Sequence, residues 1–167
     1  MPRAGRASCV SAADPAMWGA DSLVPEQVRP TLLWIDDFEP GLALYRTMFE
    51  NLGFSVFTAS SGKAGLRLAS RHHIDVVVTD YEMPEMNGDD VATSIKAINP
   101  RIPVVMFSGS TLVPERARQV VDGFCDKAGS RDQILTTIYR LLHKKRTRTL
   151  QPAPMTQASD LGHRTVA

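Results

Sequence analysis

Short apolar runs alternate with longer stretches of helical periodicity between residues 30 and about 143 of the chain. The apolar runs lie near residues 31–35, 54–58, 75–79, 103–107 and 123–126. Short runs rich in β-branched residues predict strands, and strands that alternate with helical stretches indicate a parallel sheet. The pattern therefore predicts an α/β fold of the (βα)5 type.

Each stretch between the strands has the spacing of a helix that buries one face. Leu42, Tyr45 and Phe49 recur at intervals of three and four residues, and Gly53 then ends the first helix. The remaining helices are expected to begin near Ser61, after Asn87-Gly88, at Pro114 and at Ser130. The fourth helix is short and ends near Val121.

The polarity of the strands predicts their order in the sheet. The strands at 75–79 and 103–107 are almost wholly apolar and should be central, whereas the mixed strand at 54–58 suits an edge. This favours a flavodoxin-like, doubly wound sheet with strand order 2-1-3-4-5. In such a sheet, a ligand binds beyond the carboxyl ends of the strands, where the winding reverses between strands one and three.

Length and composition indicate one domain with tails. The chain has 167 residues, of which 43% are apolar, which is enough for one core of ordinary size. Residues 1–29 are rich in Ala, Ser, Pro and Gly without a sustained period, and we expect a disordered leader there. Residues 30–143 form the predicted domain, and residues 144–167 are expected to be a flexible tail, first basic and then polar.

Charge and hydropathy exclude several classes of partner. The net charge is +1, with 19 basic and 18 acidic residues, so the molecule as a whole is no polyelectrolyte. The basic run at 144–148 comes with no helix-turn-helix pattern, so we expect no sequence-specific binding of nucleic acid. No apolar run approaches the roughly eighteen residues that a membrane helix needs. Cys9 and Cys125 lie far apart, which fits a reducing cytoplasm better than a disulfide framework.

Polar side chains follow four of the predicted strands. Asp36-Asp37 follows the first strand, Asp80 the third, Ser108 the fourth and Lys127 the fifth. Each has an ordinary explanation in isolation, such as a helix cap, a turn or a solvated strand end. Because the carboxyl ends of parallel strands meet at one edge of the sheet, the combination instead predicts a shared pocket.

The residue types in this pocket indicate phosphoryl chemistry. Carboxylates held close together repel unless a cation neutralises them, and a site with only oxygen ligands suits Mg²⁺. Asp80 could then attack phosphorus and form an aspartyl phosphate. Ser108 can donate a hydrogen bond to a phosphoryl oxygen, and Lys127 supplies a positive charge.

These motifs resemble the receiver domain of two-component response regulators over residues 30 to about 143. The resemblance rests on the acidic pair, on Met83-Pro84 and Asn87-Gly88 after Asp80, on Ser108-Gly109 and on Lys127. It implies that a sensor histidine kinase or a histidine phosphotransfer protein phosphorylates Asp80. The chain would then be a signalling switch for a downstream protein that the sequence does not identify.

The resemblance also implies a role for each site residue. Asp37 and Asp80 would bind Mg²⁺ directly, Asp36 would bind it through water, and the main-chain carbonyl of Glu82 would be a further ligand. Phe124 would be the aromatic switch residue, which moves inward when Ser108 shifts towards the phosphoryl group. The chain would be a phosphoacceptor, and would not be an enzyme beyond catalysing its own phosphorylation and dephosphorylation.

Three departures from the family pattern bear on function. Ala128 follows Lys127 where the family usually has a proline in a cis peptide, and a cis bond before Ala would cost about 3 kcal/mol, so we expect a trans bond. The segment between Ser108 and Lys127 is shorter than usual. Phe124 lacks the hydroxyl of the tyrosine found in many members, so its switching must rest on packing.

Two other functions remain open from the sequence. One is an interaction module that keeps the fold but responds weakly or not at all to phosphorylation, as Ala128 and the short fourth helix would suggest. The other is a phosphatase with an aspartate nucleophile, because Glu82 lies two residues after Asp80, the offset at which such enzymes carry their general acid.

Overall fold

A computed structural model describes residues 29–110 and 113–150 of the chain. Five parallel strands form one sheet, and the predicted strand order is confirmed as β2-β1-β3-β4-β5. The strands are β1 (Thr31–Ile35), β2 (Ser55–Ala59), β3 (Val76–Thr79), β4 (Val104–Ser108) and β5 (Gly123–Asp126). Three of them, β2, β3 and β4, begin one residue later than expected. The mixed strand β2 lies at an edge, as its polarity predicted.

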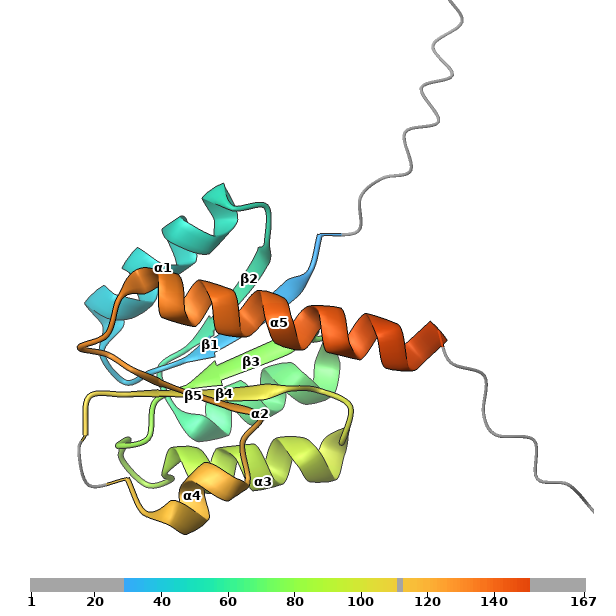
Figure 1. Ribbon diagram of the computed structural model, residues 1–167. Helices are drawn as coiled ribbons and strands as arrows, with labels where there is room; N and C mark the ends of the chain where they lie inside the picture. The colour runs from blue at the N-terminus through green and yellow to red at the C-terminus, as the bar shows by residue number, and fades with distance from the viewer. Residues whose placement is uncertain (1–28, 111–112, 151–167) are drawn as a thin grey trace, which may run out of the picture.

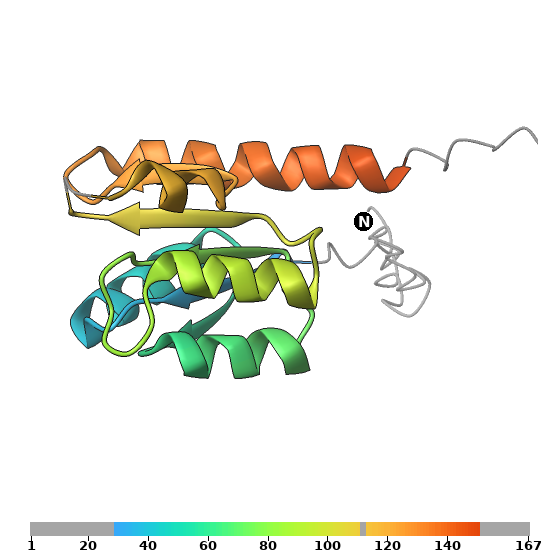
Figure 2. The same cartoon turned by 90° about the horizontal axis from the view of Figure 1, so that it is seen from below.

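Helices cover both faces of the sheet. They are α1 (Glu39–Asn51), α2 (Gly62–Arg71), α3 (Gly88–Ile98), α4 (Glu115–Gln119) and α5 (Arg131–Leu150). Helices α1 and α5 lie on one face, and α2 and α3 lie on the other (Figures 1 and 2). The predicted start of α2 is confirmed, because the hydroxyl of Ser61 accepts a hydrogen bond from the Ala64 N–H at 3.3 Å.

Alternation along the strands fills one core on each face. Leu32 and Trp34 of β1 belong to the core under α1 and α5, together with Phe49 of α1 and Ile138 of α5. Leu33 and Ile35 belong to the core under α2 and α3. Successive side chains of a strand point to opposite faces, so a sheet between two helical layers needs apolar residues at almost every position. Its loops are then the places left for polar side chains.

Two helix ends differ from the expected ones. Helix α4 ends at Gln119 and is five residues long, so it is even shorter than its sequence suggested. Helix α5 continues to Leu150, past the domain boundary expected at residue 143, and its last turns extend past the sheet (Figure 2). The residues expected to begin a flexible tail, 144–150, are therefore helical. The leader up to residue 28 and the tail from residue 151 lie outside the described residues.

The physical reason for the longer α5 is a contact at the far end of the sheet from the pocket. Lys145 donates to the Asp75 side chain at 2.9 Å and to the main-chain carbonyls of Ile74 and Asp75 at 3.4 Å. The lysines and arginines of this segment also have favourable intrinsic helix propensities. Within the described ranges, no helix combines the length and apolar content needed to span a bilayer.

Candidate functional site: a carboxylate cluster at the switch point of the sheet

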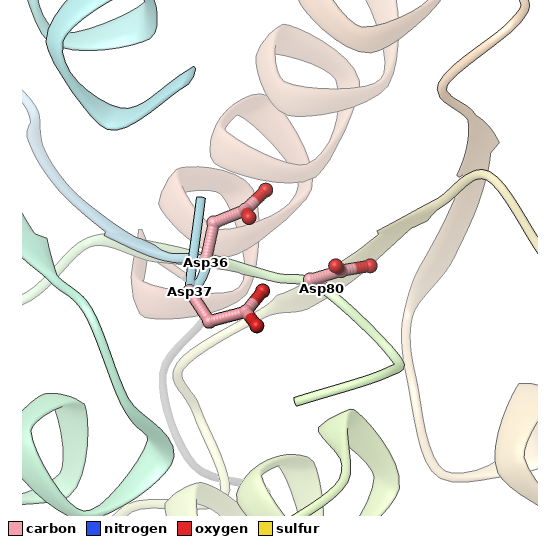
Figure 3. Close-up of side chains that lie close together, drawn as sticks. All are labelled: Asp36, Asp37 and Asp80. Carbon is pink, nitrogen blue, oxygen red and sulfur yellow. The ribbon is translucent and has the colours of Figure 1, made fainter. Parts of the chain in front are cut away.

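The register of β1 and β3 brings the acidic residues together. Ile35 pairs with Thr79, so the chain leaves both strands at the same level and continues into Asp36 and Asp80. The main-chain N–H of Asp80 donates to the carbonyl of Ile35 at 2.9 Å, which ties the two loops at their first residue. One carboxylate oxygen from each of Asp36, Asp37 and Asp80 lies within 4.8 Å of the others (Figure 3).

The three carboxylates have different surroundings. Asp36 is 2% exposed, and its Oδ1 accepts a hydrogen bond from the Phe38 N–H at 3.0 Å. Asp80 is 8% exposed, and its Oδ1 accepts a hydrogen bond from the Tyr81 N–H at 2.7 Å. Asp37 is exposed to solvent. The cluster therefore has a buried, hydrogen-bonded pair, Asp36 and Asp80, and an outer carboxylate, Asp37, that an ion in solution can reach.

Lys127 joins the two buried carboxylates. Its Nζ lies 2.8 Å from Asp36 Oδ2 and 2.9 Å from Asp80 Oδ2. Its main-chain N–H donates to the carbonyl of Ser108 at 3.0 Å, which fixes the end of β5 beside the end of β4. The peptide bond to Ala128 is trans, as predicted, since the described residues include no cis bond. Lys127 thus supplies the positive charge that the pattern of strand ends predicted.

Burial and ion pairing oppose each other at this pair. Burial raises the pKa of Asp80, although Lys127 and the Tyr81 N–H act in the opposite direction. Burial alone would lower the pKa of Lys127, but its contacts with Asp36 and Asp80 outweigh burial and raise that pKa. The first shift favours a neutral Asp80 and the second a charged pair. We favour the charged pair, because an ammonium group only 2.9 Å away stabilises the carboxylate directly.

The other predicted site residues lie at the same rim or next to it. Ser108 is the last residue of β4, is 1% exposed, and its hydroxyl accepts a hydrogen bond from the Ser110 N–H at 3.1 Å. Glu82 lies in the loop after Asp80 with an exposed side chain. Phe124 lies in β5, three residues before Lys127, and is half-buried. The hydroxyl of Ser108 is thus bonded within its own loop, and Ser108 contacts Lys127 through its main-chain carbonyl.

Gly88 is a residue whose part in the site the sequence did not reveal. A Cβ atom at this position would overlap the main-chain carbonyl oxygen of Asp80 and would come within 3.0 Å of Tyr81 Cα. The first residue of α3 therefore packs directly on the backbone that carries the central carboxylate. The Asn87-Gly88 motif predicted a turn, but only the packing of α3 shows that the position has no room for a side chain.

The donor set of the cluster fits a magnesium ion. Carboxylate oxygens are hard ligands, and Mg²⁺ is commonly held by one or two of them together with water. Asp37 is the carboxylate of the cluster that is open to solvent, whereas Asp36 and Asp80 are both buried and both contact Lys127. The main-chain carbonyl of Glu82 stays a predicted further ligand, because the resemblance alone implies it.

Fold and site together define a class of protein: a doubly wound α/β domain with an acidic cluster and a lysine at its switch point. A family model described as the response regulator receiver domain matches residues 32–139. The chain therefore belongs to the response regulator receiver family, and the resemblance drawn from its motifs is confirmed. Receiver domains are signalling switches and are generally not classed as enzymes.

Curated relatives are much longer proteins. The chain is 32% identical over 114 residues to the autoinducer 1 sensor kinase/phosphatase LuxN of Vibrio campbellii, covering 68% of this chain and 13% of LuxN. It is also 32% identical over 114 residues to the transcriptional regulatory protein GlrR of Escherichia coli, covering 66% of this chain and 26% of GlrR. The chain thus spans about a quarter or less of these proteins.

Solved structures agree with the fold. A response regulator receiver domain protein from Clostridium thermocellum has a TM-score of 0.67 at 27% identity, with 71% of this chain and 98% of that chain covered. The response regulator TrrA of Thermotoga maritima, solved in complex with Mg(2+)-BeF, has a TM-score of 0.64 at 20% identity, with 67% and 98% covered. The second likeness is a likeness of fold alone.

Proposed function

We propose that this chain is the phosphoacceptor of a two-component phosphorelay, phosphorylated on Asp80 in a Mg²⁺-dependent reaction. The observation that carries the proposal is the juxtaposition of three carboxylates within 4.8 Å with a lysine bonded to two of them. A structural ion pair would need one acid for one lysine. Three acids around one lysine leave negative charge in excess, and this excess suits a divalent cation and a phosphoryl group that binds with it.

The transfer itself needs little from the protein beyond position and charge. An Asp80 carboxylate oxygen attacks the phosphorus of a phosphohistidine, an O–P bond forms, and the P–N bond breaks with its electron pair going to the imidazole nitrogen. Lys127 lies 2.9 Å from the attacking carboxylate, so its ammonium group can pair with the phosphoryl oxygens after transfer. Ser108, at the end of the neighbouring strand, supplies a hydroxyl that can donate a hydrogen bond to them. When bound, Mg²⁺ would neutralise charge on the phosphoryl oxygens.

Phosphorylation would then change the surface of the domain. The new dianionic group attracts Ser108 and Lys127, and Phe124 moves because it lies on the strand that directly precedes Lys127. A partner that binds only one of the two conformations reads the signal. We place the protein in the cytoplasm, where Cys125, a buried free thiol, would stay reduced.

The partners follow from the chemistry. The phosphoryl donor is a sensor histidine kinase or a histidine phosphotransfer protein, and the output is either onward transfer to a second histidine or docking on a downstream protein. LuxN and the virulence sensor protein BvgS of Bordetella pertussis, which is 41% identical over 88 residues, are named as sensors, which supports a kinase partner.

The proposal is tested by incubating the protein with acetyl phosphate and Mg²⁺ and measuring its intact mass. We expect one alkali-labile phosphoryl group in the wild type and in Asp90→Asn, which removes an exposed acid on α3, and none in Asp80→Asn. Chelation of Mg²⁺ should abolish labelling, because the excess carboxylate charge then repels the phosphoryl donor.

Two outcomes would point to the other functions. Absence of labelling, with no change in amide spectra on addition of beryllofluoride, would identify an interaction module, a possibility that the five-residue α4 keeps open. Sustained turnover of several phosphomonoesters would identify a phosphatase with Glu82 as its general acid. Either result would overturn the phosphoacceptor proposal.

A further inference from the structure

Phe124 packs in a small third core beside the site. The buried members of this core are Met106 of β4, Val113 before α4 and Ala117 of α4, and Tyr81 and Val121 pack against it from the side. Met106 lies two residues before Ser108, and Tyr81 directly follows Asp80. The ends of β3 and β4 are thus each next to a side chain that packs in the same core as the Phe124 ring.

Arg118 covers the ring from the outside. Its guanidinium carbon lies 4.1 Å from the centroid of the Phe124 ring, which is within the range of a cation–π interaction. Ala117 and Arg118 are consecutive in α4, and both contact the core of Phe124, so the short helix holds the ring with two adjacent side chains. The Arg118 N–H donates to the Pro114 carbonyl at 3.3 Å, which closes the first turn of α4.

In the described conformation the hydroxyl of Ser108 accepts a hydrogen bond from the Ser110 N–H, and Lys127 contacts Asp36 and Asp80. Because these groups have partners within the protein, we take this conformation as the resting one. Any contact that the Phe124 ring makes only in this conformation opposes the switch by the free energy of that contact. The Arg118 contact is such a candidate, because Arg118 covers the ring from the solvent side, and a ring that moves inward moves away from the guanidinium.

We propose that Arg118 is a positioning residue of the switch: by its cation–π contact it holds Phe124 in the resting conformation and so raises the amount of phosphoryl ligand needed to activate the domain. The inference rests on the proposed function of Asp80. The short helix α4 would then shift the equilibrium between the resting and the activated conformation. A purely structural role, covering an apolar ring, would stabilise both conformations alike and would leave that balance unchanged.

The test compares Arg118→Gln with Arg116→Gln, which removes an exposed arginine two residues earlier on the same helix. Affinity for beryllofluoride at saturating Mg²⁺ is measured from amide spectra, and stability without ligand from urea unfolding. We expect Arg118→Gln to bind beryllofluoride about two- to fivefold more tightly than the wild type, the size expected for an exposed cation–π contact. The Arg116→Gln control should bind like the wild type.

Two further variants separate the contact from a general effect of charge. Arg118→Lys keeps a cation over the ring and should lie between the wild type and Arg118→Gln. In a Phe124→Leu background the ring is absent, so Arg118→Gln should add nothing to the affinity. If Arg118→Gln binds like the wild type or more weakly, or if its effect persists without the ring, the positioning role is wrong.

Failure of this inference is distinguishable from failure of the proposed function. A wild type that binds beryllofluoride while Arg118→Gln has unchanged affinity overturns only the role of Arg118. A wild type that does not bind beryllofluoride at all overturns both, because no phosphoryl-dependent switch then exists for Arg118 to oppose.

Discussion

Lys127 compensates the charge of the two buried carboxylates in the cluster. It is 30% exposed and contacts Asp36 and Asp80, which are almost fully buried. Without the ammonium group, two buried carboxylates would face each other with no compensating charge, and this costs free energy of folding. If Mg²⁺ binds as proposed, it would offer the same compensation from solution, so the lysine and the ion should partly substitute for each other.

We therefore expect Lys127→Met to be destabilised by about 1–3 kcal/mol and to gain more stability from Mg²⁺ than the wild type does. Urea unfolding with and without Mg²⁺ measures both effects. Lys63→Met is the matched control, because Lys63 forms only an exposed ion pair with Glu85. An equal gain from Mg²⁺ in Lys127→Met and the wild type would contradict the shared role.

Gly88 shows that the position of the site also depends on close packing of the backbone. Because the position has no room for a Cβ, α3 can begin directly against the Asp80 carbonyl and keep the loop that carries Asp80 in one place. The precision of the site therefore depends on a residue that has no chemistry of its own.

At the scale of elements, α5 is tied to the sheet at the end opposite the carboxylate cluster. Asp75 accepts hydrogen bonds from the Thr31 N–H at 3.0 Å and from Lys145 at 2.9 Å, so it links the start of β1 to the last turns of α5. Burial favours the neutral acid, but these two bonds outweigh burial and lower the pKa of Asp75 below its ordinary value of 3.8. His73, whose Nδ1 is 3.9 Å from Asp75 Oδ2, acts in the same direction when protonated.

The lowered pKa predicts how the link depends on pH. An acid whose pKa is depressed in the folded state adds stability above its unfolded pKa of about 3.9, and this stability is lost as the pH falls through the folded pKa. We expect Lys145→Met to lower the free energy of unfolding by about 1–2 kcal/mol at pH 7. The difference from the wild type should begin to shrink below about pH 4 and should shrink further as the pH falls through the lowered pKa of folded Asp75.

Urea unfolding between pH 7 and pH 3 measures this difference. Lys144→Met, which removes an exposed lysine on the same turn of α5, should show none of it. A difference between Lys145→Met and the wild type that stays constant down to pH 3 would show that the link does not depend on the charge of Asp75.

At the scale of the whole molecule, the described residues form one domain with its site at one end and the α5 link at the other. The buried apolar residues described lie between Leu32 and Leu141. Both cores share the same sheet, so the strand ends that carry Asp36, Asp80 and Lys127 are positioned by packing on both faces at once. Helix α4 has only five residues, and Ala117 is its buried residue.

The division of the chain can be tested directly. We expect residues 29–150 alone to unfold cooperatively at the temperature of the full chain and to keep the Mg²⁺-dependent response to beryllofluoride. A chain that ends at His143 lacks Lys145 and should unfold a few degrees lower, as expected for the loss of about 1–2 kcal/mol. Equal melting temperatures of the two shortened chains would show that the last turns of α5 contribute nothing to stability.

The sequence by itself determined the element order, the strand order and the polar residues at the strand ends. These features are local: strand and helix spacing show in a few neighbouring residues, and the positions of Asp36, Asp80, Ser108 and Lys127 follow once the strand ends are known. The family motifs lie in the same short segments, so they are recognisable without knowledge of the packing. For this reason the amino-acid pattern alone was enough to predict the class of protein.

The tertiary structure decided what those residues contact. Lys127 is 91 positions from Asp36, and nothing in either segment shows that they bond to each other. The missing room at Gly88, the guanidinium over Phe124 and the extra turns of α5 likewise depend on which surfaces meet after folding. Contacts between distant segments arise from the packing of whole layers, and no local pattern of apolar and polar positions contains them.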